Sequence, residues 1–131
     1  MIKFTQKERE FLSSLEEARI ATASGKMPHV KPVSYIFDDD SIYVATDYST
    51  KTYKNLKENP HAAVTIDIYR VGGHKAVLIQ GKVKIIEGGA EFDRIYAKFF
   101  EKFEWVRRDP WKAGEAPFVK IIPTTKKSWG T

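Results

Sequence analysis

Six short segments with the pattern of β-strands follow one another along the chain, and turn-forming residues separate most of them. They cover residues 19–23, 29–37, 41–47, 62–70, 74–87 and 118–122. In the fourth segment Val64, Ile66 and Ile68 alternate with smaller or polar side chains, which is typical of a half-buried strand. Strands and helices do not alternate regularly, which argues against a parallel doubly wound sheet. The pattern predicts an α+β, mainly β domain whose antiparallel strands form a closed or half-closed barrel.

A few helical segments interrupt these strands. Thr5 to Glu8 has the Ser/Thr-x-x-Glu form of a capping box, which predicts a helix that starts at Thr5 and ends near Ala18. A second helix is expected over residues 49–59, closed by a proline, and a third, strongly amphipathic one over residues 92–103. Gly81 interrupts the fifth strand, where a bend or bulge is expected. A loop that contains two tryptophans and Arg107-Arg108 is expected to lead into the last strand.

Composition sets broad limits on what the chain does. Its 131 residues predict one domain over residues 1–131. Cysteine is absent, which removes disulfides and thiolate chemistry. No apolar run is long enough for a membrane-spanning helix, and the charged N-terminus does not resemble a signal peptide, so a cytoplasmic protein without a membrane partner is expected. The net charge of +5 favours anionic partners, such as a phosphorylated cofactor or a nucleic acid.

The segment from Thr46 to Leu56 contains the strongest functional signal, because it leads from the end of a strand into a helix. Free backbone N–H groups and the helix dipole favour an anion at such a position. Ser49, Thr50 and Thr52 add hydroxyl groups, and Lys51 adds a positive charge in the first turn, where a cation opposes the dipole unless an anion binds. The pattern is compatible with a phosphate site, but on the local pattern alone an ordinary hydroxyl cap with solvated lysines is the favoured explanation.

A second signal lies in the strand that contains Pro32, Val33 and Ser34. Proline cannot donate to a strand ladder, so this strand is expected at an edge or a bulge. A free edge leaves backbone N–H and C=O groups available to the polar rim of a planar heterocycle, and Ser34 adds a hydroxyl. The alternative is an ordinary sheet edge that proline and lysine protect from pairing.

Taken together, these segments resemble the pyridoxamine-phosphate-oxidase-like, flavin-binding split barrels over nearly the whole chain. The resemblance depends on the helix at the start, the stretch 32–35 before an acidic turn, residues 42–46 and 49–60, Gln80-Gly81, and residues 122–129. It implies a six-stranded antiparallel split β-barrel with a few peripheral helices, which forms a homodimer. It also implies a flavin, FMN or alternatively the deazaflavin F420, in the groove between the two subunits.

Carried over by position, the resemblance assigns a flavin role to ten residues. Thr50, Lys51 and Thr52 would hold the phosphate, and Ser49 and Thr46 would help there. Pro32, Val33 and Ser34 would line the isoalloxazine ring. Lys75 and Trp129, on other strands, are weaker candidates.

The expected function is that of an FMN-dependent oxidoreductase that transfers hydride to or from a small molecule, for which a nicotinamide nucleotide is one candidate. No residue stands out as a catalytic acid or base. The short C-terminal segment and the single lysine of the phosphate segment differ from a true pyridoxamine phosphate oxidase. Two alternatives stay open: a flavin-binding module without turnover, and a basic nucleic-acid-binding barrel with Tyr35 and Tyr43 on its face, although nucleic acid is the less favoured partner. Three histidines lack metal-ligand spacing, so no metal is expected; they are His29, His61 and His74.

Overall fold

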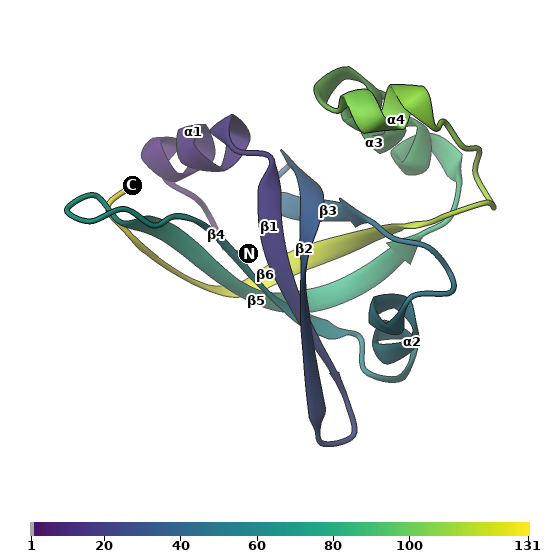
Figure 1. Cartoon of the computed structure of the whole chain (residues 1–131), viewed down its shortest axis with the longest axis horizontal. Coiled ribbons are helices and arrows are strands. Elements are labelled where there is room, and N and C mark those ends of the chain that lie inside the picture. Colours follow the sequence, from purple (N-terminus) through teal and green to yellow (C-terminus); the bar gives the residue numbers. More distant parts are fainter. Residues whose placement is uncertain (1) are drawn as a thin grey trace.

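The computed structural model describes residues 2–131, which form six strands and four helices (Figure 1). The strands are β1 (Glu17–Ser24), β2 (Met27–Asp38), β3 (Ser41–Ala45), β4 (His61–Ile68), β5 (Lys75–Ile86) and β6 (Phe118–Trp129). The helices are α1 (Gln6–Ser14), α2 (Lys51–Glu58), α3 (Gly89–Lys102) and α4 (Glu104–Arg108). The strands close into an antiparallel barrel in the order β1-β2-β3-β6-β5-β4. This confirms the predicted six-stranded barrel with peripheral helices.

Alternating side chains of the strands fill the interior of the barrel. Ile20, Ile66 and Ile79 are completely buried there, as the period of two along a strand requires. The barrel is closed between β1 and β4 by only three residue pairs, formed by residues 19–21 and 63–65. Ala21 and Ala63 are paired across this narrow seam and have small side chains, which shapes the groove described below.

Helix α1 packs against the barrel core with Phe11 and Leu12. Its predicted capping box is present, since the Glu8 N–H donates to the Thr5 hydroxyl and the Thr5 N–H donates to the Glu8 carboxylate. The sequence predicted that this helix ends near Ala18, but it ends at Ser14. Ala18 already belongs to β1 and is buried in the barrel core.

Helices α3 and α4 form a second apolar cluster on the outside of the barrel. The amphipathic stripe of α3 buries Phe92, Ile95 and Phe99 against Phe118 of β6. The predicted loop begins instead as the short helix α4, which contains Arg107 and Arg108. No helix in residues 2–131 has the length and apolar character needed to cross a membrane.

Gly81 marks the irregularity that the sequence predicts in the fifth strand. The pairing between β5 and β6 shifts by one residue between Gln80 and Gly81, which leaves Thr124 as the extra residue of a bulge. A Cβ atom at Gly81 would lie 2.4 Å from the carbonyl oxygen of Ile122, so only glycine permits this close approach. Beyond the bulge β6 continues to Trp129. Strand patterning predicted that it ends at Ile122, which is seven residues earlier.

Candidate functional site

The junction between β3 and α2 brings two threonine hydroxyls together. Thr46 follows the end of β3, and its Oγ1 lies 2.7 Å from Oγ1 of Thr50. Thr50 is the N-cap of α2: its Oγ1 accepts a hydrogen bond from the N–H of Tyr53 at 3.1 Å and donates to the carbonyl oxygen of Asp47 at 3.0 Å. The start of the helix is therefore held in a fixed position relative to the strand.

The first turn of α2 retains unpaired backbone donors. The N–H groups of Tyr53 and Lys54 both bond to Thr50, through its side chain and its carbonyl group. Among residues 2–131, no acceptor is paired with the N–H groups of Lys51 and Thr52. The first turn carries no acidic residue, and the Lys51 side chain is exposed. Two free donors, the positive end of the helix dipole and one cation therefore meet at this point, which favours an anion.

The side chain of Thr52 lies on the opposite side of the helix. It is completely buried with Asn55 between α2 and β1, where Asn55 Nδ2 donates to Thr22 Oγ1 at 3.1 Å. The Thr52 hydroxyl has no partner among the described residues. Of the predicted phosphate residues, Thr46, Thr50 and Lys51 thus lie around the helix start, exposed Ser49 precedes them, and Thr52 offers its backbone N–H.

Strand β2 has an open edge directly beside this junction. Residues 27–34 pair with β1 only, because β3 joins β2 from Tyr35 onward. If the register of β2 and β3 is continued by two residues, Thr46 falls beside Val33. Pro32, Val33 and Ser34 therefore line an unpaired edge that faces the start of α2, as proline within the strand predicts.

Lys31 is a residue of this site that was not included among the ten candidates. It lies opposite Ile20 in β1, so its side chain leaves the strand on the same face as that of Thr22, which α2 covers. Helix α2 runs from the Thr46 end of this face to the tip of the hairpin, where Ser24 donates to Glu58. The half-buried Lys31 therefore adds a second cation to the face of the barrel that α2 covers. Its position follows from strand register, which spacing along the sequence does not show.

A cavity of about 250 Å³ adjoins the junction on the side of α4. Thr46 lines one wall, and the stacked indoles of Trp105 and Trp111 line the other, with ring centroids 5.9 Å apart and planes 7° apart. Trp105 Nε1 donates to the Ser34 hydroxyl at 3.2 Å, which ties this wall to the open edge of β2. The cavity is also lined by three carboxylates, those of Asp47, Asp109 and Glu115. They disfavour a phosphate in this cavity, whereas the Lys51 side of the junction carries a cation and free backbone donors.

Tyr48 lies in the loop between these two regions. Burial, a hydrogen bond to Glu87 and the charge of that carboxylate raise the pKa of Tyr48 to about 12. Its phenol therefore stays neutral and donates to Glu87 at 2.8 Å, while its ring packs edge-on against Tyr53. This contact fixes the loop that carries Ser49.

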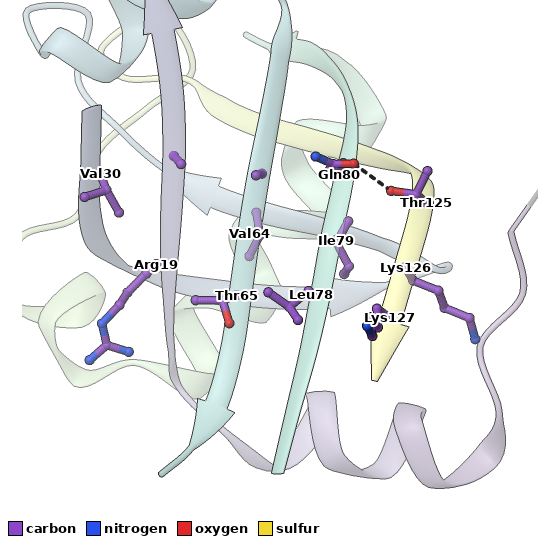
Figure 2. Close-up of a pocket in the computed structure, with 12 residues that line it drawn as sticks. Arg19, Val30, Val64, Thr65, Leu78, Ile79, Gln80, Thr125, Lys126 and Lys127 are labelled. Atoms are coloured by element: carbon purple, nitrogen blue, oxygen red, sulfur yellow. Dashed lines mark hydrogen bonds between the residues drawn. The ribbon is translucent and has the colours of Figure 1, made fainter. Parts of the chain in front are cut away.

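An apolar groove of about 510 Å³ runs over the outer face of the barrel (Figure 2). Its lining comes from β1, β2, β4, β5 and β6, and the small side chains Ala21 and Ala63 flank the narrow seam of the barrel. Val30 is 65% exposed on one side of the groove, and Leu78 is 37% exposed within it. Side chains of this size and exposure in one continuous depression are typical of an interaction surface.

Lys75 and Trp129 lie at the far end of this groove. They lie where β5 begins and β6 ends, beside a second depression of about 420 Å³ that shares Arg19 and Thr65 with the groove. Lys82 of β5 pairs with His61, the residue that follows α2 and Pro60. Lys75 lies seven positions before Lys82, about 20 Å away along the strand. The turn between β4 and β5 and helix α2 lie on opposite sides of the barrel (Figure 1). Within one chain, therefore, Lys75 and Trp129 do not join the junction at Thr46.

Two further expectations concern a nucleic-acid face and a metal. Tyr35 and Tyr43, which were expected on the barrel face, are completely buried, so the nucleic-acid interpretation loses its aromatic platform. In the part of the chain that the structure describes, no three His, Asp or Glu side chains are grouped to hold a metal ion.

Comparison with known proteins identifies the relatives of this chain. The sequence model of the family described as pyridoxamine 5'-phosphate oxidase matches residues 4–129. A search of curated protein sequences finds no match.

Solved structures share the fold at low sequence identity. An FAD-binding protein from Mesorhizobium loti is 20% identical with a TM-score of 0.76, and the match covers 95% of this chain and 94% of that one. An FAD-binding protein from Mycobacterium smegmatis is 16% identical with a TM-score of 0.71, covering 96% and 94%. The heme storage protein of Vibrio cholerae is 12% identical with a TM-score of 0.80, covering 98% and 94%. At these identities the likeness shows the fold alone.

Proposed function

The chain belongs to the pyridoxamine 5'-phosphate oxidase family, and on that premise we propose that it binds FMN and acts as an oxidoreductase on a small molecule. The observation that carries the proposal is the junction of β3 and α2. There, two free backbone N–H groups, a cation and a pair of threonine hydroxyls lie beside an open strand edge. A phosphate joined to a planar heterocycle fits this combination of groups. The FAD-binding proteins of similar fold support the same class of cofactor.

The phosphate belongs at the start of α2. The N–H groups of Lys51 and Thr52 would donate to its oxygens, and the helix dipole adds a favourable field. The Thr50 hydroxyl already caps the helix, so its main role is to hold the first turn in place. In this proposal Lys51 supplies positive charge from the helix and Lys31 supplies it from the strand. The sequence alone suggested Lys51 as the single lysine of the phosphate site.

The isoalloxazine ring belongs along the open edge of β2. The unpaired backbone groups of residues 32–34 would meet the polar rim of the ring, and the Ser34 hydroxyl adds a side-chain contact. Trp105, which donates to Ser34, and Trp111 would limit the far end of the ring and exclude water there. When bound, the flavin supplies hydride transfer, and the chain supplies binding, orientation and a dry environment.

A second copy of the chain completes this site in our proposal. Lys75 and Trp129 lie too far from Thr46 to serve a flavin bound by their own chain. A partner whose barrel covers the apolar groove would shield Val30 and Leu78 from water and would bring its own Lys75 and Trp129 toward the flavin. The homodimer therefore explains both the exposed groove and the division of the candidate residues between two ends of the barrel.

The test separates binding of the phosphate from binding of the ring. FMN, F420, FAD and riboflavin are each titrated against the pure protein, and the quenching of flavin fluorescence gives the affinities. FMN is expected to bind more tightly than riboflavin, which lacks the phosphate. Lys51→Ala is expected to weaken FMN about tenfold through loss of a charge-assisted contact and to leave riboflavin unchanged. Lys57→Ala, in the last turn of the same helix, is the matched control.

Equal affinities for FMN and riboflavin, or no binding of any flavin, would overturn the proposal. If FMN binds, its reduction by nicotinamide nucleotides under anaerobic conditions distinguishes an oxidoreductase from a flavin-binding module without turnover. A bound flavin that no nicotinamide nucleotide or small reductant reduces favours the module.

A further inference from the structure

His74 lies between two aromatic side chains at the far end of the groove. Its ring packs edge-on against Tyr69 and Trp129, with centroids 4.7 Å and 5.3 Å away. Trp129 Nε1 donates a hydrogen bond to His74 Nδ1 at 3.3 Å. On the other side of the ring, Nε2 lies 3.6 Å from Oδ2 of Asp67. Both nitrogens of the imidazole therefore face a specific group.

These contacts determine where the histidine carries its proton. An indole N–H only donates, so it bonds to Nδ1 only while that nitrogen keeps a free lone pair. The single hydrogen of the neutral ring is then on Nε2, where it faces the Asp67 carboxylate. The neutral form of His74 is thus the form that holds Trp129.

Protonation of His74 reverses this arrangement. The new hydrogen on Nδ1 opposes the indole N–H, because two donors then face each other. The imidazolium is attracted to Asp67 of β4, which Arg19 of β1 also approaches to 3.6 Å. Lys75, the next residue in the chain, adds a positive charge in the same segment. Gain of a proton therefore strengthens the contact with Asp67 and releases Trp129.

The backbone beside the indole is held too closely to follow such a change. A Cβ atom at Gly130 would lie 2.6 Å from the carbonyl oxygen of His74, so this segment is packed directly against the start of β5. The Trp129 side chain, which is 39% exposed, is the part that is free to move. It forms one wall of the 420 Å³ depression together with His74 and Asp67.

We propose that His74 is a positioning residue, which holds the Trp129 indole against the end of the groove when neutral and releases it when protonated. An unperturbed histidine side chain changes charge between about pH 5 and pH 8, so this is the interval in which the position of Trp129 is tested. One consequence rests on the proposed function: if Trp129 contacts the flavin of a second copy, flavin affinity decreases as the pH falls through the same interval.

The experiment follows the indole N–H of Trp129 in the full chain. Its ¹H–¹⁵N signal, assigned with Trp129→Phe, is recorded from about pH 8 to about pH 5. In the native chain the signal is expected to move from a hydrogen-bonded to a free position in one titration. His74→Asn puts an amide oxygen close to the place of Nδ1 and does not titrate, so its Trp129 signal is expected to stay hydrogen-bonded. His74→Phe removes the acceptor, so its signal is expected to stay free at every pH.

The signals of Trp105 and Trp111 in the same spectra are internal controls, since neither indole lies beside His74. A Trp129 signal that ignores pH in the native chain, or that titrates in His74→Asn as in the native chain, would overturn the proposal. The flavin consequence is measured separately as FMN affinity at both ends of the interval. A decrease of about fivefold toward acid pH in the native chain, absent in His74→Asn, supports it.

The two arms have distinct failures. A chain that binds no flavin at any pH contradicts the proposed function, and the indole titration still decides the role of His74. A chain that binds FMN equally at all pH values, while the indole signal titrates, contradicts the contact between Trp129 and the flavin alone.

Discussion

The carboxylate of Glu8 connects α1 to the last strand, and its removal should cost a measurable share of the stability of the fold. Glu8 is 4% exposed. Its oxygens accept hydrogen bonds from Lys126 Nζ at 2.5 Å, from Ser128 Oγ at 2.6 Å and from the Thr5 N–H at 2.8 Å. Burial by itself would raise the pKa of Glu8, but these hydrogen bonds and the charge of Lys126 lower it from 4.5 to about 2.

The lowered pKa gives both the size and the sign of the effect. A shift of this size corresponds to about 3 kcal/mol in favour of the ionised folded state. Because the pKa is lower in the folded state, the unfolded chain binds the proton more readily. The stabilisation is therefore complete above about pH 5 and is lost as the pH falls toward about 2.

The assay is urea unfolding of the native chain and of Glu8→Gln, followed by circular dichroism at one fixed protein concentration. At pH 7 the variant is expected to be less stable by about 3 kcal/mol, and near pH 3 the difference should fall to about half or less. Glu10→Gln is the control, since Glu10 is exposed on the same helix and its side chain bonds, among residues 2–131, only to Gln6. A Glu8→Gln variant within about 0.5 kcal/mol of the native chain at pH 7, or a difference that ignores pH, would refute the reasoning.

Two further variants test the bulge and the groove. Gly81→Ala should lower the free energy of unfolding by about 2 to 3 kcal/mol, because its new Cβ meets the Ile122 carbonyl oxygen. Gly73 has open space around it, so Gly73→Ala should leave stability nearly unchanged. Thermal unfolding of both variants measures the difference. Leu78→Lys should convert a dimer to a monomer in sedimentation experiments without unfolding it, since Leu78 is already 37% exposed. Phe100, which is 42% exposed, lies outside the groove, so Phe100→Lys should keep the native oligomeric state. A native chain that sediments as a monomer would contradict the proposed dimer.

Features that depend on a few neighbouring residues could be predicted from the sequence. The capping box at Thr5, the amphipathic face of α3 and the irregularity at Gly81 each arise from local geometry, and the structure contains all three. The last strand was predicted too short from patterning because its second half does not look like a strand. There Lys126 and Ser128 point toward Glu8 instead of an apolar core, so the usual alternation of apolar and polar residues is lost.

The candidate site divides in the same way. The start of α2 could be predicted, since a strand end, a hydroxyl cap and a lysine follow one another within six residues, from Thr46 to Lys51. The position of Lys31 requires the register of β1 and β2, and the wall formed by Trp105 requires the packing of α4 onto Ser34. These are contacts between segments far apart in the chain, which no local pattern specifies.

The division of candidate residues between two ends of the barrel constrains how the family fold can serve a flavin here. The proposed flavin at the start of α2 would contact Lys51, Thr46 and the open edge of β2 in one chain, but the barrel itself would separate it from Trp129. The exposed groove lies between these two ends, over strands β1, β2, β4, β5 and β6. A partner that buries this groove thereby carries the His74–Trp129 pair with it. If the proposed dimer and the proposed flavin site are both present, then dimer formation, flavin affinity and the protonation of His74 are linked quantities, so a change in any one of them should alter the other two.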